Sequence, residues 1–150
     1  MLRAIELSAG NLKDLHGGPF GALVVQGERV LGQGSNQVLA RNDPTAHAEI
    51  VAIRQACTIL DSYDLSDCLI YSSCEPCPMC LGAIYWARIK GIYYACTRDD
   101  AAEIGFDDRF FYQELIKPAG LRQIKSEQAL RAQGLEVFER WKLLEDRPLY

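Results

Sequence analysis

The chain has 150 residues and a formal net charge of −4, with 16 basic and 20 acidic side chains, and this length corresponds to one domain with its own core. Residues 1–96 and 97–150 each carry a net charge of −2, so a large basic surface for nucleic acid is not expected. There is no apolar run of about 18 residues, and the first residues lack the order of a secretory signal, so we expect a soluble, cytoplasmic protein without a membrane segment.

The first part of the chain predicts a helix, a hairpin and a second helix. The first helix covers residues 2–15 and ends before a Gly-Gly-Pro cluster. Its apolar side chains fall close to one helical face: Leu2, Ile5, Leu12 and Leu15. Two short strands follow over residues 20–25 and 29–34, joined by a Gln-Gly-Glu turn. A second helix with an apolar stripe is predicted over residues 46–60.

The middle of the chain predicts a pair of parallel strands. A strand over residues 68–72, a helix over 78–88 and a strand over 91–96 follow one another with short connections. Such a unit is a right-handed crossover, and it places its two strands in parallel.

The last third of the chain predicts helices only. Helical segments over residues 98–105 and 108–116 precede a break, and a last helix over about 126–144 carries an apolar stripe that needs a surface to pack on. Because we find no repeat and no linker, residues 1–150 are predicted to form a single α/β domain with helices flanking a mixed sheet.

Six cysteines and two histidines are the residues that could hold a soft metal ion. In the cytosol, clustered cysteines indicate a metal more often than a disulfide. Cys74, Cys77 and Cys80 cluster, and the last two lie three apart at the predicted start of a helix. The helix dipole and the unpaired N–H groups favour thiolates there. A nitrogen ligand has to come from His16 or His47.

His47, Cys77 and Cys80 match three ligands of a tetrahedral zinc whose fourth position is left to water. Glu49 can reach the same site if the metal lies beyond the N-terminal end of its helix. Since two thiolates already balance the charge of the metal, this carboxylate is free to take a proton from the zinc-bound water and return it to the substrate. A four-cysteine structural site fails on spacing, and a redox pair does not explain Glu49.

The segments around His47 and Cys77 spell H-x-E and P-C-x-x-C, the signature of zinc-dependent nucleobase deaminases. Over essentially its whole length the chain resembles the cytidine and deoxycytidylate deaminase superfamily. Residues 42–49 are shared by tRNA adenosine deaminases and bacterial guanine deaminases. The features that resemble bacterial guanine deaminases in particular are residues 17–22, 73–88 and 105–108 and the C-terminal Tyr150.

The resemblance implies a cytidine deaminase-like three-layer α/β/α sandwich with a five-stranded mixed sheet. It also implies a homodimer whose C-terminal helical segment, about residues 121–150, is exchanged between subunits, and the apolar stripe of the last helix fits such an exchange. The implied reaction is the hydrolysis of guanine at C2 to xanthine and ammonia, with one zinc ion per subunit.

The resemblance also assigns roles to single residues. It implies that His47, Cys77 and Cys80 bind zinc and that Glu49 moves protons during hydrolysis. Asp108 matches a second carboxylate, which handles the protons of the departing amino group. The residues that match substrate contacts are Asn36 at the base edge, Trp86 as an aromatic wall and Tyr150 as a C-terminal lid over a site, expected to be the partner's.

Three alternatives remain open at this point. A tRNA adenosine deaminase shares the zinc motif, but it would need basic side chains for an anticodon stem. A deaminase of another free base or of an aminotriazine would use the same zinc site. An inactive zinc protein that serves in dimerisation is disfavoured by Glu49 beside an open zinc position.

Overall fold

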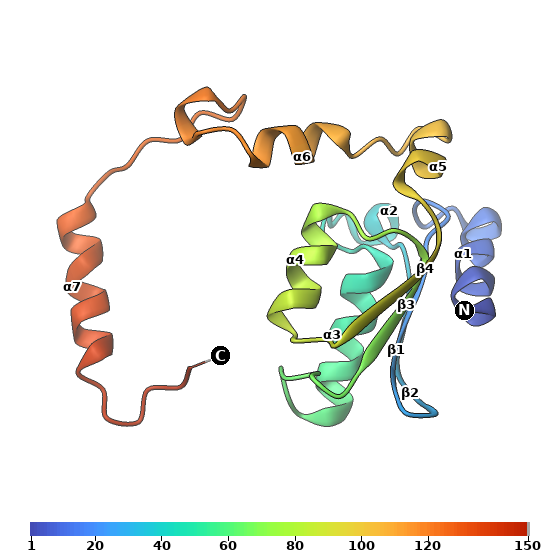
Figure 1. The fold of residues 1–150 in the computed structure, drawn as a ribbon, viewed down its shortest axis with the longest axis horizontal. Helices are drawn as coiled ribbons and strands as arrows, with labels where there is room; N and C mark the ends of the chain where they lie inside the picture. Colours follow the sequence, from blue (N-terminus) through green and yellow to red (C-terminus); the bar gives the residue numbers. More distant parts are fainter. Residues whose placement is uncertain (150) are drawn as a thin grey trace. The chain divides into compact units, whose positions relative to one another are not determined.

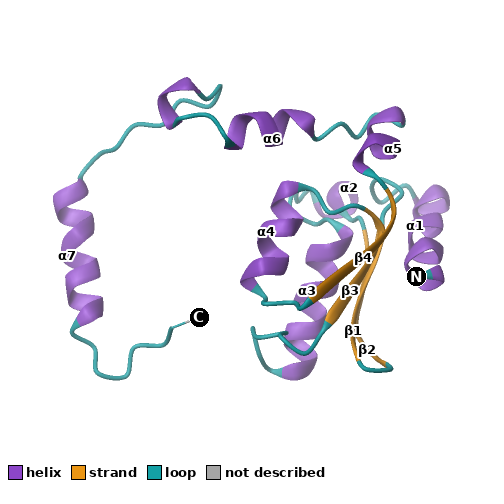
Figure 2. Cartoon of the chain, viewed as in Figure 1, coloured by secondary structure: helices purple, strands orange, loops and turns teal. Residues whose placement is uncertain are grey.

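The computed structural model describes residues 1–149 and forms two units, residues 1–111 and residues 112 onward. The elements in chain order are α1 (Leu2–Asp14), β1 (Gly21–Gln26), β2 (Arg29–Ser35), α2 (Val38–Arg41), α3 (Ala48–Leu60), β3 (Leu69–Cys74), α4 (Pro78–Trp86), β4 (Gly91–Cys96), α5 (Arg98–Glu103), α6 (Arg109–Leu115), the 3₁₀ helix η1 (Ala119–Leu121) and α7 (Arg131–Lys142). Figures 1 and 2 show how the sheet and its helices are arranged in the first unit.

The sheet has the strand order β2-β1-β3-β4. β1 pairs antiparallel with both β2 and β3, and β3 pairs in parallel with β4. The predicted hairpin and the predicted parallel crossover are therefore confirmed, and the sheet is mixed. The expectation of five strands is wrong for residues 1–149, which contain four. Directly after β4 a capping box between Thr97 and Asp100 starts a helix, and the segments that follow are helical or unpaired.

Helices cover both faces of the sheet, which gives the three layers (Figure 1). On the face of α1, a Cβ atom at Gly21 would lie only 2.3 Å from the Ala4 carbonyl oxygen. On the face of α3, a Cβ atom at Gly34 would lie 2.6 Å from the Ala48 carbonyl oxygen. In the pairing of β1 with β2, Gly21 lies opposite Ser35 and Gly34 lies opposite Ala22. Because successive residues of a strand point to opposite faces, these two glycines face opposite sides of the sheet and let a helix backbone approach each side closely.

The core lies between the sheet and α3, with α4 closing one side. α3 meets the sheet through three fully buried alanines at four-residue spacing, Ala48, Ala52 and Ala56. The larger core side chains come from β1 to β3 and from the neighbouring loop and helix: Val24, Leu31, Leu65, Ile70 and Ile84. Small residues on the helix and glycines on the strands set the height of α3 above the sheet, and with it the position of the first turn of this helix.

α1 buries a different face from the predicted one. Its four apolar stripe residues are exposed: Leu2, Ile5, Leu12 and Leu15. The buried residues of this helix are Ala4 and Asn11, which lie two turns apart on one face. The close approach to Gly21 leaves room for a small side chain at Ala4 and excludes leucine.

The chain between α3 and β3 is tied to the end of α4. Asp64 accepts hydrogen bonds from the Ser66 backbone N–H at 2.9 Å and from the Arg88 guanidinium at 2.6 Å. Hydrogen bonding to the Ser66 side chain, then to the Ser66 backbone and to Arg88, lowers the pKa of Asp64 to about 2. Arg88 has a left-handed backbone with φ of 59°, which turns the chain from α4 toward β4.

The second unit contains η1 and α7. The predicted last helix is confirmed in position but is shorter, covering Arg131–Lys142. Its large apolar side chains are exposed: Val137, Phe138 and Trp141. None of the helices within residues 1–149 has the length and apolar character that crossing a bilayer requires.

Candidate active site

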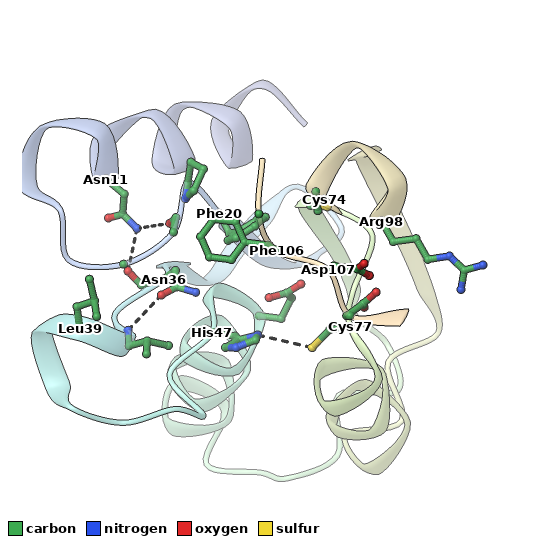
Figure 3. Close-up of a pocket in the computed structure, with 18 of the residues that line it drawn as sticks. Asn11, Phe20, Asn36, Leu39, His47, Cys74, Cys77, Arg98, Phe106 and Asp107 are labelled. Atoms are coloured by element: carbon green, nitrogen blue, oxygen red, sulfur yellow. Dashed lines mark hydrogen bonds between the residues drawn. The ribbon is translucent and has the colours of Figure 1, made fainter. Parts of the chain in front are cut away.

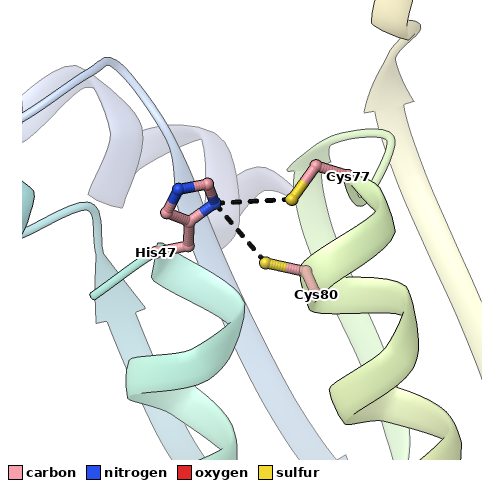
Figure 4. Close-up of side chains that lie close together, drawn as sticks. All are labelled: His47, Cys77 and Cys80. Atoms are coloured by element: carbon pink, nitrogen blue, oxygen red, sulfur yellow. Dashed lines mark hydrogen bonds between the residues drawn. The ribbon is translucent and has the colours of Figure 1, made fainter. Parts of the chain in front are cut away.

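Three side chains from two helices converge at one point of the first unit (Figure 4). His47 is the N-cap of α3, Cys77 is the N-cap of α4 and Cys80 lies in the first turn of α4. The His47 Nδ1 atom is 3.6 Å from the Cys77 Sγ atom and 3.5 Å from the Cys80 Sγ atom. All three ligand atoms lie within 4.8 Å of one another. The structure therefore brings together the three predicted metal ligands.

Local sequence sets both helix starts. Before α3, the Asp43 carboxylate accepts hydrogen bonds from the Thr45 backbone N–H at 2.8 Å and from its hydroxyl at 2.7 Å. The buried Ala46 follows, so His47 leaves this turn in an extended conformation. Before α4, Pro78 occupies the first helical position, where its missing N–H costs nothing.

The donor set fits a zinc ion. Zn–S bonds of about 2.3 Å and Zn–N bonds of about 2.05 Å at the tetrahedral angle place sulfur and nitrogen about 3.6 Å apart. The two observed Nδ1–Sγ distances are 3.6 and 3.5 Å. One imidazole and two sulfurs also match the ligand type that zinc prefers, and three protein ligands leave one position open.

The two sulfur atoms differ in protonation when no metal is bound. A hydrogen bond from the Cys80 thiol, followed by one from the His47 ring, lowers the pKa of Cys77 to about 4. The pKa of Cys80 is raised, because its proton is held by Cys77 and because the side chain is fully buried. The hydrogen bond with Cys77 raises the pKa of His47. The pair of sulfurs thus holds one proton and one negative charge.

Glu49 is a buried carboxylic acid beside these ligands. It lies in the first turn of α3 and is 6% exposed. Its Oε1 atom accepts a hydrogen bond from the Ser72 hydroxyl at 3.2 Å, and its Oε2 atom is 3.5 Å from the Cys80 Sγ atom. Burial raises the pKa of Glu49. A carboxylic acid whose pKa moves toward neutrality is suited to both accept and donate a proton.

His47, Cys77 and Glu49 border a pocket of about 620 Å³ whose other described lining also comes from residues 11–111, while Cys80 is fully buried and is not part of this lining (Figure 3). Asn36 and Asp108, the residues expected at the base edge and at the departing amino group, both line it. Asn36 is 5% exposed, and its Oδ1 atom accepts a hydrogen bond from the Val38 backbone N–H at 3.1 Å. The Asp108 Oδ1 atom is buried and finds no hydrogen-bond partner within residues 1–149. Burial is the first cause that raises the pKa of Asp108.

Two predicted substrate contacts are not among these residues. Trp86 lies at the end of α4, is 69% exposed and does not line the pocket. Tyr150 lies outside the described residues.

Several pocket residues had been given no role from the sequence, among them Asn11, Phe20 and Phe106. The rings of Phe20 and Phe106 meet edge to face, with centroids 5.0 Å apart. Both phenylalanines lie inside the motifs that resemble guanine deaminases, which was the signal available for them. For Asn11 the signal was its position in an amphipathic helix, two turns after the small residue Ala4 and on the same face.

The sequence has relatives across its whole length. The family model for the cytidine and deoxycytidylate deaminase zinc-binding region matches residues 1–96. Guanine deaminase from Bacillus subtilis (strain 168) is 49% identical over 148 residues, which cover 99% of this chain and 95% of that protein. A tRNA-specific adenosine deaminase from Agrobacterium fabrum is 37% identical over 133 residues, which cover 85% of this chain and 84% of that protein.

Solved structures of guanine deaminases share the fold of this chain. The X-ray structure of the Bacillus subtilis guanine deaminase matches with a TM-score of 0.96 at 48% identity, covering 99% of this chain and 95% of that chain. Guanine deaminase from Nitrosomonas europaea matches with a TM-score of 0.66 at 32% identity, covering 90% of this chain and 69% of that chain. The likeness to the first of these structures thus includes both units.

Proposed function

This chain belongs to the cytidine and deoxycytidylate deaminase family, and from that premise we propose that it hydrolyses guanine to xanthine and ammonia. The observation that carries the proposal is the likeness to the Bacillus subtilis guanine deaminase, which extends over nearly the whole of both chains. The tRNA-specific relative is less similar in sequence, and the even −2 charge of the two parts argues against a large basic surface for an RNA stem.

Zinc is the cofactor, one ion for each chain, with His47, Cys77 and Cys80 as its ligands. When bound, it supplies a Lewis acid that lowers the pKa of a water molecule to about 7 and so makes a nucleophile available at neutral pH. The protein holds these ligands on the first turns of two helices that pack on the same sheet. Their spacing is therefore set by the core and not by a flexible loop.

Glu49 moves the proton of the attacking water. Its carboxylate accepts that proton as the water oxygen attacks C2 of guanine, and it delivers the proton to the ring nitrogen beside C2. Hydrogen bonding to Ser72 fixes one oxygen, so the second oxygen keeps its direction toward the reacting atoms. The raised pKa lowers the cost of holding the proton between the two transfers.

Asp108 handles the protons of the departing amino group: it passes the second water proton from the new hydroxyl at C2 to this group, which leaves as ammonia when the C2–N bond breaks and the C2 carbonyl forms. A buried acceptor oxygen without a partner in residues 1–149, on a residue that lines the pocket, supports this role. Asn36 contacts the edge of the base. Since its Oδ1 atom is engaged by a backbone N–H, the amide nitrogen is the end that donates to an acceptor of the purine.

The purine ring is enclosed by apolar side chains. Phe20 and Phe106 line the pocket and form an aromatic corner. These two residues form the aromatic wall that we had expected Trp86 to form within the same chain. Tyr150 closes over the pocket of the other subunit in this proposal, as a C-terminal lid.

The enzyme is a homodimer in which the segment of about residues 121–150 is exchanged between subunits. β4 is an edge strand with exposed aromatic residues, Tyr93 and Tyr94, and α4 presents Tyr85 and Trp86 beside it. Exposed aromatic side chains at an unpaired sheet edge support a partner surface here. The exposed apolar side chains of α7 support the same conclusion for the second unit.

The compartment is the cytoplasm. All six cysteines are free thiols, and a thiolate zinc site is stable in a reducing environment.

Ammonia release from a panel of amines tests the function. The panel contains guanine, adenine, cytosine, an aminotriazine and a tRNA anticodon stem. We expect guanine to be turned over fastest, with xanthine as the second product. Turnover of another amine in place of guanine by zinc-loaded protein would reject the assignment. A salt-sensitive complex with the stem would favour the tRNA alternative.

The Glu49→Gln variant tests the mechanism. It keeps the size and the three zinc ligands but cannot accept a proton, so turnover is expected to fall by at least about a hundredfold while the zinc content stays at one ion per chain. Activity near that of the wild type would show that another group moves the proton.

A further inference from the structure

We propose that Asn11 of α1 is a positioning residue that sets guanine affinity through Asn36. Asn11 lies outside the segments that resemble the deaminase motifs. The inference rests on the proposed function, because Asn36 is the residue assigned to the base edge. Asn11 lies at the wall of the same pocket. Its effect is expected on substrate binding and selectivity, since its side-chain hydrogen bonds within residues 1–149 go to Gly18 and Asn36 and not to Glu49 or the zinc ligands.

The Asn11 amide ties two parts of the pocket wall to one helix. The side chain is buried, with 4% of the residue exposed. Its Nδ2 atom donates to the Gly18 carbonyl oxygen at 2.9 Å and to the Asn36 carbonyl oxygen at 2.8 Å (Figure 3). Both hydrogens of the amide are therefore used. A carbonyl that loses its only donor inside the protein is left without a partner, which destabilises this arrangement of the pocket wall.

The backbone of Asn11 restrains the same loop from the other side. The Leu15 N–H donates to the Asn11 carbonyl oxygen at 3.0 Å, and Leu15 ends α1 in a left-handed conformation with φ of 50°. The chain turns there and reaches Gly18 three residues later. One residue thus holds the loop at its beginning through the backbone and near its end through the side chain.

The loop and Asn36 have little room to move independently. A Cβ atom at Gly17 would lie 2.0 Å from the Asn36 Oδ1 atom. The Asn36 backbone N–H donates to the Phe20 carbonyl oxygen at 3.0 Å. A displacement of residues 17–20 is consequently passed to the Asn36 side chain. Asn11 is the buried polar side chain that bonds to both partners.

A double-mutant cycle separates positioning from general stability. Asn11→Ala is expected to raise KM for guanine about tenfold while kcat changes less than about threefold. In the Asn36→Ala background the same substitution is expected to change KM less than about twofold, because the group through which it acts is gone. Zinc content and melting temperature are measured for all four proteins.

Matched variants complete the design. Lys13→Ala, an exposed change on the same helix, is the control and should leave KM unchanged. Gly17→Ala, which pushes on Asn36 directly, should raise KM as Asn11→Ala does. If Asn11→Ala does not fold, Asn11→Ser replaces it in the cycle, since its hydroxyl keeps one donor.

Two results would overturn the inference: an equal rise in KM in both backgrounds, or no rise in either. Wild-type turnover of guanine is measured first and tests the proposed function alone. If another amine from the panel proves to be the substrate, the proposed function fails and the cycle is run with that amine. The coupling between Asn11 and Asn36 that this cycle measures then decides whether Asn11 has the positioning role.

Discussion

Re-binding of zinc to metal-free protein reports the protonation of the three ligands. Without metal, the sulfurs of Cys77 and Cys80 hold one proton between them, and the raised pKa of His47 leaves its ring largely protonated at pH 6. Zinc binds deprotonated ligands. At pH 6 binding should therefore release about two protons, and the association constant should rise about 100-fold per pH unit. Ligands with ordinary pKa values would release about three protons, and the rise would be about 1,000-fold.

Isothermal titration calorimetry in two buffers of different ionisation enthalpy counts these protons. The measurement is made near pH 6 because a water ligand of zinc has a pKa of about 7 and keeps its proton there. Glu49→Gln is the control, since it removes the neighbouring carboxyl group that could exchange a proton. A count of three protons in both proteins would refute the shared proton. The pH dependence of zinc affinity in competition with a chelator gives an independent slope.

Four further changes test the fold and the tail. Gly32→Ala adds a Cβ atom that would lie 2.0 Å from the Ala52 carbonyl oxygen, so the free energy of unfolding should fall by about 1–3 kcal/mol. Gly10→Ala in α1, where a Cβ atom meets nothing within 4 Å, should raise it by about 0.5–1 kcal/mol, and urea unfolding compares the two. Asp64→Asn should lower the melting temperature at pH 7. The pKa of Asp64 is about 2 when folded and about 3.9 when unfolded, so the wild-type advantage is complete above about pH 4 and fades as pH falls toward 2; an advantage that persists below pH 2 would contradict the sign. Deletion of residues 148–150 should lower turnover more than it lowers the melting temperature, and full activity in the truncated enzyme would exclude a lid.

The metal ligands were predictable because their signals are local. Two histidines in the chain left few candidates for the nitrogen ligand, and Cys77 and Cys80 lie at fixed spacing on one helix start. Glu49 could be predicted as the proton-transfer residue because it lies two residues after His47, close enough to reach the same metal. The parallel pairing of β3 and β4 also followed from local order, since a short crossover helix permits one arrangement.

The remaining features depend on contacts between distant segments. The buried face of α1 was mispredicted because apolar spacing does not report how closely a helix approaches a sheet. Gly21, distant in sequence, decides that a small residue faces inward at Ala4. Asn11 could not be given a role for the same reason, since its partners lie 7 and 25 residues away. The five-strand expectation came from the resemblance, and pairing at a sheet edge is not encoded in the local pattern of β4.

Every described residue that lines the pocket belongs to the first unit. Substitutions among residues 112–149 therefore change no described wall of the pocket in their own chain. In this proposal they reach the reaction by way of the other subunit, whose pocket receives the exchanged segment, so a protein that carries such a substitution in one subunit should lose turnover in the opposite subunit.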